Sequence, residues 1–181
     1  MTAAYVEALG PAESVRVGEI SVPTLGPTDA LVEVEATVVN PVDTLVRSGR
    51  FATRTPFPFV IGRDLVGTVV EAGEGIGHAV GDRVWCNSLG HDGRQGAFAQ
   101  YAVVAADRLY RLPDGVDPTT ALAVAHPAVT AYLAWFQHAG VRAGETVYVG
   151  GAAGNVGRAA LAMAKYAGTR VVASAGPPDR D

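Results

Sequence analysis

A glycine-rich stretch at residues 150–157, with the sequence GGAAGNVG, constrains the fold of this chain more than any other feature. A strand-like segment at 145–149 precedes it, and a helix-like segment at 155–167 and a further strand at 170–173 follow. When a strand turns directly into a helix, the first N–H groups of the helix lack partners and form an anion site together with the helix dipole. Glycines spaced three residues apart let the main chain approach a pyrophosphate and let the helix pack closely on the strand. The stretch therefore predicts a strand–helix–strand unit that binds the phosphates of a dinucleotide; a glycine-rich turn kept only for tight packing is the alternative.

The tip of the second strand determines which dinucleotide such a unit prefers. An NAD site has an Asp or Glu there, which binds the 2′-hydroxyl of the ribose. This chain has Ser174-Ala175-Gly176, whose small side chains leave room for a 2′-phosphate, and Arg180 stands a few residues further on. Asp179 and Asp181 follow two prolines and lie beyond the expected tip. The sequence therefore predicts NADP(H), with Ser174 and Arg180 beside the 2′-phosphate; a solvated Arg180 is the alternative.

The composition is that of a globular protein, with 49% hydrophobic and 18% charged residues. A net charge of −4 without a basic run argues against nucleic acid and against anionic membranes as partners. The single cysteine, Cys86, rules out an internal disulfide and a cysteine-rich zinc site, and it fits a reducing compartment. We find no signal peptide and no apolar stretch of the ~20 residues that a membrane helix needs, so we expect a cytoplasmic protein.

Residues 1–110 have the composition of β structure interrupted by Gly and Pro, whereas helical and strand-like segments alternate after about residue 117. In 31–36 (LVEVEA) apolar and acidic residues alternate, as in a half-buried strand, and Pro41 is well placed to open a helix over 41–48. The change of pattern predicts two domains, 1–117 and 118–181. We expect strands at 3–9, 15–21, 30–39, 65–72, 83–86, 98–105 and 109–112, and helical segments at 118–125 and 129–138.

Four ordered motifs resemble those of the medium-chain dehydrogenase/reductase superfamily, and in particular its quinone oxidoreductase (zeta-crystallin-like) branch. Residues 40–49 (NPVDTLVRSG) resemble the N-P-x-D-x-x-x-R-x-G segment of that branch. Residues 62–73 (GRDLVGTVVEAG), closed by GDRV at 81–84, are similar to a second segment, and VTAY at 129–132 and AAGNVG at 152–157 match two more. The resemblance implies an α/β protein with a β-rich domain: a chaperonin-10-like (GroES-like) N-terminal domain followed by a partial Rossmann fold of one βαβ unit.

The resemblance also implies chemistry without a metal. Zinc-dependent relatives place a Cys where this chain has Asn40 and a His where it has Arg63, and they carry a four-cysteine lobe where this chain has 85–90 (WCNSLG). Without a Lewis acid to polarise an alcohol, the zinc route of alcohol oxidation is disfavoured. The implied function is an NADPH-dependent oxidoreductase that reduces a quinone or an α,β-unsaturated carbonyl compound by hydride transfer, in which the cofactor carries the chemistry.

The same resemblance assigns roles to individual residues. Asn40 would lie near the nicotinamide, on a helix that Asp43 and Arg47 hold in place, and Thr130 would contact the cofactor. Separately from the resemblance, His126 precedes Pro127 near the expected cofactor cleft and is a candidate proton donor to an enolate-like product; a structural histidine is the alternative. The expected pyrophosphate cradle consists of Ala153, Gly154, Asn155, Val156 and Gly157.

A dinucleotide-binding domain has two halves, and this sequence contains only the first. Three interpretations stay open: the chain is a fragment of a longer protein, a partner chain or second copy supplies the missing strands, or the chain is a non-catalytic nucleotide-binding or protein-interaction module. Residues 175–181 lie where relatives have a loop before their next helix, which favours a fragment. A quinone or enone is the expected small-molecule partner, and the resemblance also admits a homodimer.

Overall fold

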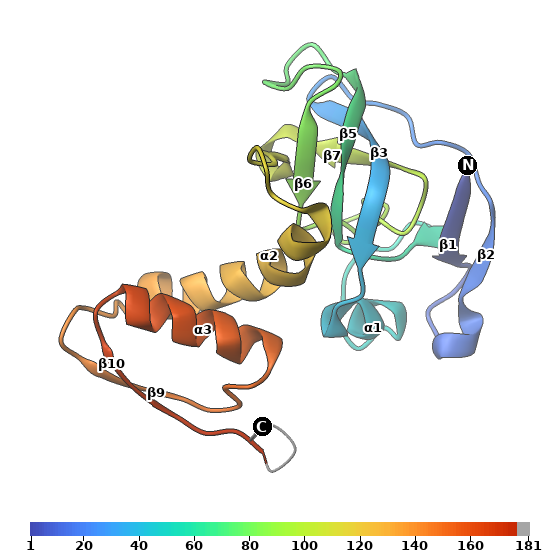
Figure 1. Ribbon diagram of the computed structural model, residues 1–181. Coiled ribbons are helices and arrows are strands. Elements are labelled where there is room, and N and C mark those ends of the chain that lie inside the picture. The colour runs from blue at the N-terminus through green and yellow to red at the C-terminus, as the bar shows by residue number, and fades with distance from the viewer. Residues whose placement is uncertain (177–181) are drawn as a thin grey trace. The chain divides into compact units, whose positions relative to one another are not determined.

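The computed structural model describes residues 1–176, which divide into two compact units. The first unit comprises residues 1–122 and the second begins at Ala123. In Figure 1 the first unit contains most of the strands, whereas the second combines helices with a pair of strands. The boundary falls inside α2 (Pro118–Tyr132), so this helix contributes residues to both units.

Two antiparallel sheets form the first unit. The larger has the strand order β7-β3-β5-β6-β8 and the smaller has the order β2-β1-β4. Figure 1 shows β3, β5 and β6 side by side in the larger sheet. The elements are β1 (Thr2–Val6), η1 (Ala12–Ser14), β2 (Arg16–Glu19), β3 (Asp29–Val38), α1 (Pro41–Arg47), β4 (Phe59–Val60), β5 (Asp64–Ala72), β6 (Arg83–Cys86), β7 (Tyr101–Ala105), η2 (Ala106–Arg108) and β8 (Tyr110–Arg111).

The pairing of β3 with β5 forms the centre of the larger sheet. Along β3 the carboxylates of Glu33 and Glu35 are exposed, while Ala30 and Val32 are fully buried, as the alternating sequence predicts. β5 is buried along most of its length, and its Leu65 packs into the same core as Val32. The core face of this sheet therefore removes a continuous apolar surface from water, which is the main favourable term in folding.

Helix α1 packs against the smaller sheet. Its Val46 is buried in a cluster with Val6 of β1 and Phe59 of β4. At the end of the helix the guanidinium of Arg47 donates a hydrogen bond to the carbonyl oxygen of Gly10. These contacts hold helix α1 against segments that are distant in the sequence. They also hold Asn40, the residue that precedes the first turn of the helix.

The second unit contains one strand–helix–strand motif. It consists of β9 (Thr146–Val149), α3 (Asn155–Tyr166) and β10 (Arg170–Ala173), and the two strands pair in parallel. One face of α3 presents the buried Gly157, Ala160 and Ala164, which share a side of the helix because of their spacing. The indole N–H of Trp135 donates to the carbonyl oxygen of Ala160 at 2.9 Å, so this tryptophan belongs to the packing of the unit.

The helical region before β9 differs from the prediction. The sequence favours separate segments at 118–125 and 129–138, but α2 runs without a break from Pro118 to Tyr132 and continues as a π-helical segment, Leu133–His138 (η3). Pro127 has no N–H to donate within the helix, a defect that costs ~3 kcal/mol in an exposed helix. Here Pro127 is buried, so its ring gains apolar contacts that offset part of this cost.

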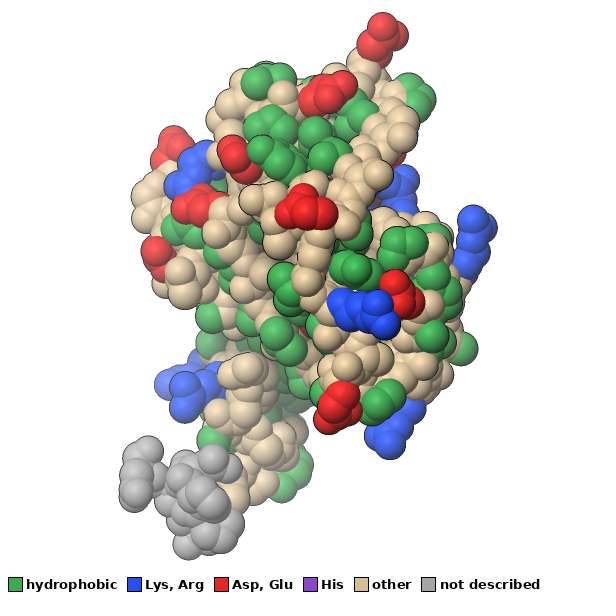
Figure 2. Space-filling model, turned by 90° about the vertical axis from the view of Figure 1, so that its right-hand side faces the viewer, with side chains coloured by type: hydrophobic (Ala, Val, Ile, Leu, Met, Phe, Trp, Pro, Cys, Tyr) green, Lys and Arg blue, Asp and Glu red, His purple; other side chains and the backbone are tan. Residues whose placement is uncertain are grey.

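Charged side chains are dispersed over the face that Figure 2 shows. On the face shown in Figure 2, acidic and basic side chains stand as separate small groups between hydrophobic ones, without a continuous basic stripe. Within residues 1–176, no helix combines the length and the apolar character that crossing a membrane requires.

The closeness of β3 and β5 predicts the effect of a methyl group at Gly67. A Cβ there would lie 2.1 Å from the carbonyl oxygen of Glu33 and 2.8 Å from a methyl carbon of Val32, so the strands would have to separate. We expect Gly67→Ala to lower the free energy of unfolding by about 1–3 kcal/mol in chemical denaturation. Gly77→Ala is the control, because a Cβ at Gly77 meets nothing within 4 Å. Equal stability of the two variants would contradict this account of the sheet.

Candidate functional site

The glycine-rich turn between β9 and α3 depends on two glycines for different reasons. Gly151 has a φ of 64°, in the left-handed region that side chains other than glycine disfavour. Gly157 is buried, and a Cβ there would lie 2.2 Å from the carbonyl oxygen of Gly151 and 2.7 Å from the Cα of Ala152. The first turn of α3 therefore lies directly against the turn that precedes it. Tight packing accounts for Gly157 and the left-handed conformation for Gly151, and both are compatible with the predicted approach of a phosphate.

The first turn of α3 leaves main-chain N–H groups without main-chain acceptors. The first hydrogen bond across the start of the helix runs from the N–H of Arg158 to the carbonyl oxygen of Gly154, at 2.8 Å. The N–H groups of Asn155, Val156 and Gly157 have no main-chain acceptor in the described part of the chain. Gly154, Asn155 and Val156 are exposed, Ala153 is half-buried, and Gly157 is buried. The turn fits a diphosphate, because these N–H groups and the helix dipole favour an anion.

The tip of β10 lies beside this turn. The N–H of Ala152 donates to the carbonyl oxygen of Ser174 at 2.8 Å, and the hydroxyls of Ser174 and Tyr148 share a hydrogen bond of 2.7 Å. Ser174 is exposed, and no acidic residue occurs in 171–176. The structure thus brings Ser174 together with the glycine-rich turn, as a dinucleotide site requires. Arg180 lies outside the described residues.

Asn40 occupies a buried position at the start of α1. Its side-chain amide donates to Oδ2 of Asp64 at 2.7 Å, and its main-chain N–H donates to Oδ2 of Asp43 at 2.6 Å. Asp64 is fully buried. Two carboxylates therefore fix the orientation of Asn40, one through its side chain and one through its main chain. Sequence reasoning did not single out Asp64; its place in the GRD motif at 62–64 was the signal available.

Thr130 and His126 lie one turn apart on α2. The hydroxyl of Thr130 donates to the carbonyl oxygen of His126 at 2.9 Å, and Thr130 is exposed while His126 is half-buried. Both belong to the second unit together with the glycine-rich turn, whereas Asn40 belongs to the first. The predicted site residues are thus divided between the two units.

Potential metal ligands are not clustered. Among residues 1–176, no group of three or more His, Cys, Asp or Glu side chains is arranged to hold a metal ion. Burial raises the pKa of the Cys86 thiol to about 12, which keeps it protonated and a poor ligand.

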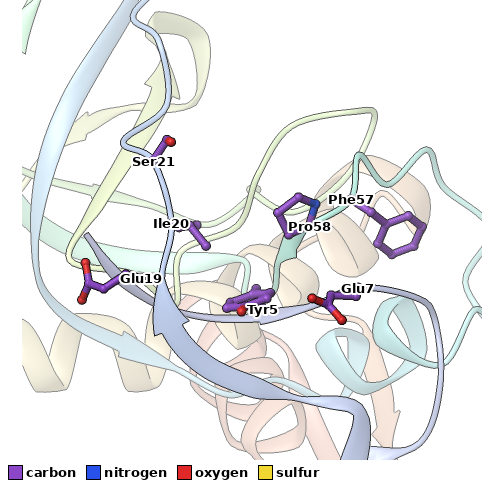
Figure 3. A pocket seen from close by; sticks show the side chains of 7 residues that line it. All are labelled: Tyr5, Glu7, Glu19, Ile20, Ser21, Phe57 and Pro58. Carbon is purple, nitrogen blue, oxygen red and sulfur yellow. The ribbon is translucent and has the colours of Figure 1, made fainter.

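A surface pocket of about 680 Å³ lies elsewhere in the first unit (Figure 3). Both carboxylates that line it already have partners. Glu7 forms an ion pair with Arg16 at 3.0 Å. Glu19 forms an ion pair with the N-terminal amine at 3.1 Å and accepts a hydrogen bond from the Thr2 hydroxyl at 2.6 Å. These bonds lower the pKa of Glu19, with the Thr2 hydrogen bond as the main cause. This pocket contains none of the residues that the sequence singles out.

Comparisons with known proteins give the family. Residues 26–114 match the alcohol dehydrogenase GroES-like domain. The quinone oxidoreductase of Pongo abelii is 39% identical over 160 residues, which make up 87% of this chain and 47% of that protein. The chain thus spans about half the length of the curated relatives that it matches.

Two solved structures extend the likeness over nearly the whole chain. One described as an NAD-dependent alcohol dehydrogenase has a TM-score of 0.90 at 30% identity, covering 99% of this chain and 59% of that one. A mycobacterial protein solved in complex with NADPH has a TM-score of 0.84 at 32% identity, covering 96% of this chain and 51% of that one.

The GroES-like β domain, the β9–α3–β10 motif and these likenesses identify the class: the chain belongs to the medium-chain dehydrogenase/reductase superfamily. Within it, the chain is similar to quinone oxidoreductases, at 39% and 36% identity to those of Pongo abelii and Homo sapiens. The fold class expected from the ordered motifs is thereby confirmed.

The contact between Gly157 and Gly151 predicts how the turn responds to substitution. Gly157→Ala would force the start of α3 away from the turn, so we expect a loss of about 1–3 kcal/mol in stability. Amide hydrogen exchange across residues 150–160 should become faster, as mass spectrometry can measure. Gly150→Ala is the matched control, because its Cβ would meet its nearest neighbour, the Tyr148 ring, at an ordinary contact distance of 3.6 Å. Similar exchange in both variants would show that the helix does not depend on this approach.

Proposed function

We propose that this chain forms the nucleotide-phosphate site and the Asn40 site of an NADPH-dependent oxidoreductase. It reduces a quinone or an α,β-unsaturated carbonyl compound by hydride transfer, without a metal. The observation that carries the proposal is the run of N–H groups at residues 155–157 that have no main-chain acceptor among residues 1–176, next to the uncharged tip of β10 at Ser174. The quinone oxidoreductase relatives and the NADPH complex of a similar protein support it.

In this proposal the residues of the chain bind and orient. The N–H groups of Asn155, Val156 and Gly157 hold the diphosphate, and Ser174 leaves space for the 2′-phosphate. The bound nicotinamide supplies the hydride. Asn40 lies near the nicotinamide, with its amide held by Asp64 so that its orientation is set before the substrate binds. Thr130 contacts the cofactor, and His126 gives a proton to the enolate-like product.

The metal-free part of the proposal rests on the donor set. Asn40 and Arg63 offer an amide and a guanidinium at the positions where zinc-dependent relatives place two ligands. A guanidinium stays protonated in proteins and cannot bind a metal ion. Hydride addition to a quinone or an enone needs a stabilised oxyanion rather than a polarised alcohol, and hydrogen-bond donors can provide that.

Cofactor choice is testable at Ser174. Ser174→Asp places a carboxylate at the tip of β10, which should repel the 2′-phosphate of NADPH and bind the ribose hydroxyls of NADH. We expect fluorescence titration to show NADPH affinity falling by about tenfold or more while NADH affinity is kept or improved. Tyr148→Phe is the control, because it removes the hydroxyl bonded to Ser174 without adding charge. A parallel loss of both nucleotides would argue against NADP(H) at this strand tip.

The reductase activity is tested by an assay with NADPH. The intact mass of the assayed protein is measured first, so that the length of the chain under test is known. We expect oxidation of NADPH with 1,4-naphthoquinone or 2-cyclohexenone in the presence of EDTA, followed by absorbance at 340 nm, since the proposed route needs no metal. Nucleotide binding without turnover would support the non-catalytic module instead. Turnover that appears only after zinc is added would overturn the metal-free proposal.

A further inference from the structure

A groove between helices α2 and α3 lies within the second unit, and the proposed function leaves it unused. Its volume of about 440 Å³ falls in the range of roughly 300–1,000 Å³ that is typical of small-molecule sites. Every residue that lines it lies in 123–163, so the groove is formed inside this unit alone. The lining residues are Ala123, Val124, Pro127 and Ala128 of α2, and Asn155, Arg158, Ala159, Ala162 and Met163 of α3.

The two walls of the groove are apolar helix faces. On each helix the lining residues recur every three or four positions, which places them on one side of the helix. Four of them are alanines, whose small side chains leave the space between the helices unfilled. Val124 remains 52% exposed at the groove. An apolar ligand that covers these side chains removes their surface from water, which is favourable.

The end of the groove at the start of α3 carries a positive charge. Arg158 is the fourth residue of α3, and side chains of a helix lean toward its N-terminus, so the guanidinium points toward the first turn. Arg158 is exposed and forms no ion pair among residues 1–176. The helix dipole disfavours a cation at this end of a helix, and a bound anion removes that disadvantage.

Carboxylates are scarce in this part of the chain. Residues 123–176 contain one carboxylate, that of Glu145, and four basic side chains, those of Arg142, Arg158, Lys165 and Arg170. Glu145 accepts the main-chain N–H of Arg142 at 2.8 Å and does not line the groove. The whole chain has a net charge of −4, so the excess of positive charge is local to this stretch. The charge around the groove therefore favours an anionic ligand.

We propose that the groove binds a free medium-chain fatty carboxylate, with its alkyl chain between α2 and α3 and its carboxylate at Arg158. The stretch from Asn155 to Met163 is about 12 Å long at about 1.5 Å per residue, which suits a medium-chain alkyl group. A guanidinium offers two parallel donors that match the oxygens of a carboxylate. A sugar phosphate would leave the apolar walls uncovered, and an uncharged alkane would leave Arg158 without an anion.

The site has a consequence for nucleotide binding. Asn155 lines the groove, and its N–H belongs to the proposed diphosphate site at the same end of α3. A carboxylate at Arg158 and a diphosphate at residues 155–157 therefore compete for one region of positive potential. The fatty carboxylate thus lowers the affinity for the nucleotide, and only this consequence rests on the proposed function.

The experiment measures binding to the chain directly and without a nucleotide. Decanoate is titrated below its micelle concentration, and the ¹³C-methyl signal of Met163, one of two methionines, is followed by NMR. We expect a saturable shift with decanoate. Octanoate should bind roughly tenfold more weakly, because two fewer CH₂ groups are buried. Decanamide, which lacks the charge, should also bind about tenfold more weakly than decanoate.

Two variants separate the charged end of the groove from its apolar walls. Arg158→Gln should weaken decanoate binding by about tenfold and leave decanamide binding unchanged, because it removes only the charge pairing. Ala162→Leu places a larger side chain in the groove, at an exposed helical position that tolerates leucine, and should weaken both ligands. Arg170→Gln is the matched control, because Arg170 is exposed on β10 and does not line the groove.

Three results would overturn the site. Equal affinity of the unmodified chain for decanoate and decanamide would remove the role of the carboxylate. A Met163 signal that does not respond, or an unchanged decanoate affinity in Ala162→Leu, would place the alkyl chain elsewhere. Equal losses in Arg158→Gln and Arg170→Gln would reduce the attraction to overall charge.

A competition titration tests the link to the nucleotide. Decanoate should raise the apparent Kd of NADPH in the unmodified chain but have little effect in Ala162→Leu. Independent binding of both ligands would contradict a carboxylate at the start of α3. A chain that binds decanoate but no nucleotide would contradict the proposed function and support the groove as a separate site.

Discussion

The candidate nucleotide site depends on how closely a helix can approach the turn that leads into it. At Gly157 the main chain of α3 lies so near the carbonyl of Gly151 that no side chain fits between them. The N–H groups of the first turn of α3 have no main-chain acceptor among the described residues, and the tip of β10 at Ser174 lies beside the turn. A larger residue at Gly157 would push the helix away from the turn, whereas one at Gly151 would have to adopt a left-handed conformation.

At the Asn40 site, a buried carboxylate sets the orientation of a side-chain amide. Asp64 is fully buried, and a buried carboxylate is tolerated only where hydrogen bonds compensate for lost hydration. One of those bonds comes from the amide of Asn40, and Asp43 holds the main chain of the same residue. Because both the side chain and the main chain of Asn40 are held, its amide keeps one orientation. A ligand that contacted this amide would therefore cause no further loss of conformational entropy there.

The local sequence pattern predicted those strands and turns whose limits are set by residues adjacent in the sequence. β6 (Arg83–Cys86) and β10 (Arg170–Ala173) have the predicted bounds, because turns and apolar runs delimit them. The two-residue strand β4 was missed, since only its pairing with distant Tyr5 and Val6 makes it a strand. The break expected near Pro127 is absent, because tertiary packing outweighs a local preference. The open donors at 155–157 followed from glycine spacing, whereas the bond between Asn40 and Asp64 joins residues 24 positions apart and needed the fold.

The parallel pair of β9 and β10 has a consequence for handling the protein. Each strand has a single hydrogen-bonded neighbour in the described residues, so both outer edges present unpaired main-chain groups. Beside these edges, Tyr148 is 64% and Val172 is 53% exposed. Such an edge is a template for another extended segment, whatever its source. Strand addition at either edge would satisfy these main-chain groups, and an extended peptide that pairs with β9 or β10 would cap them.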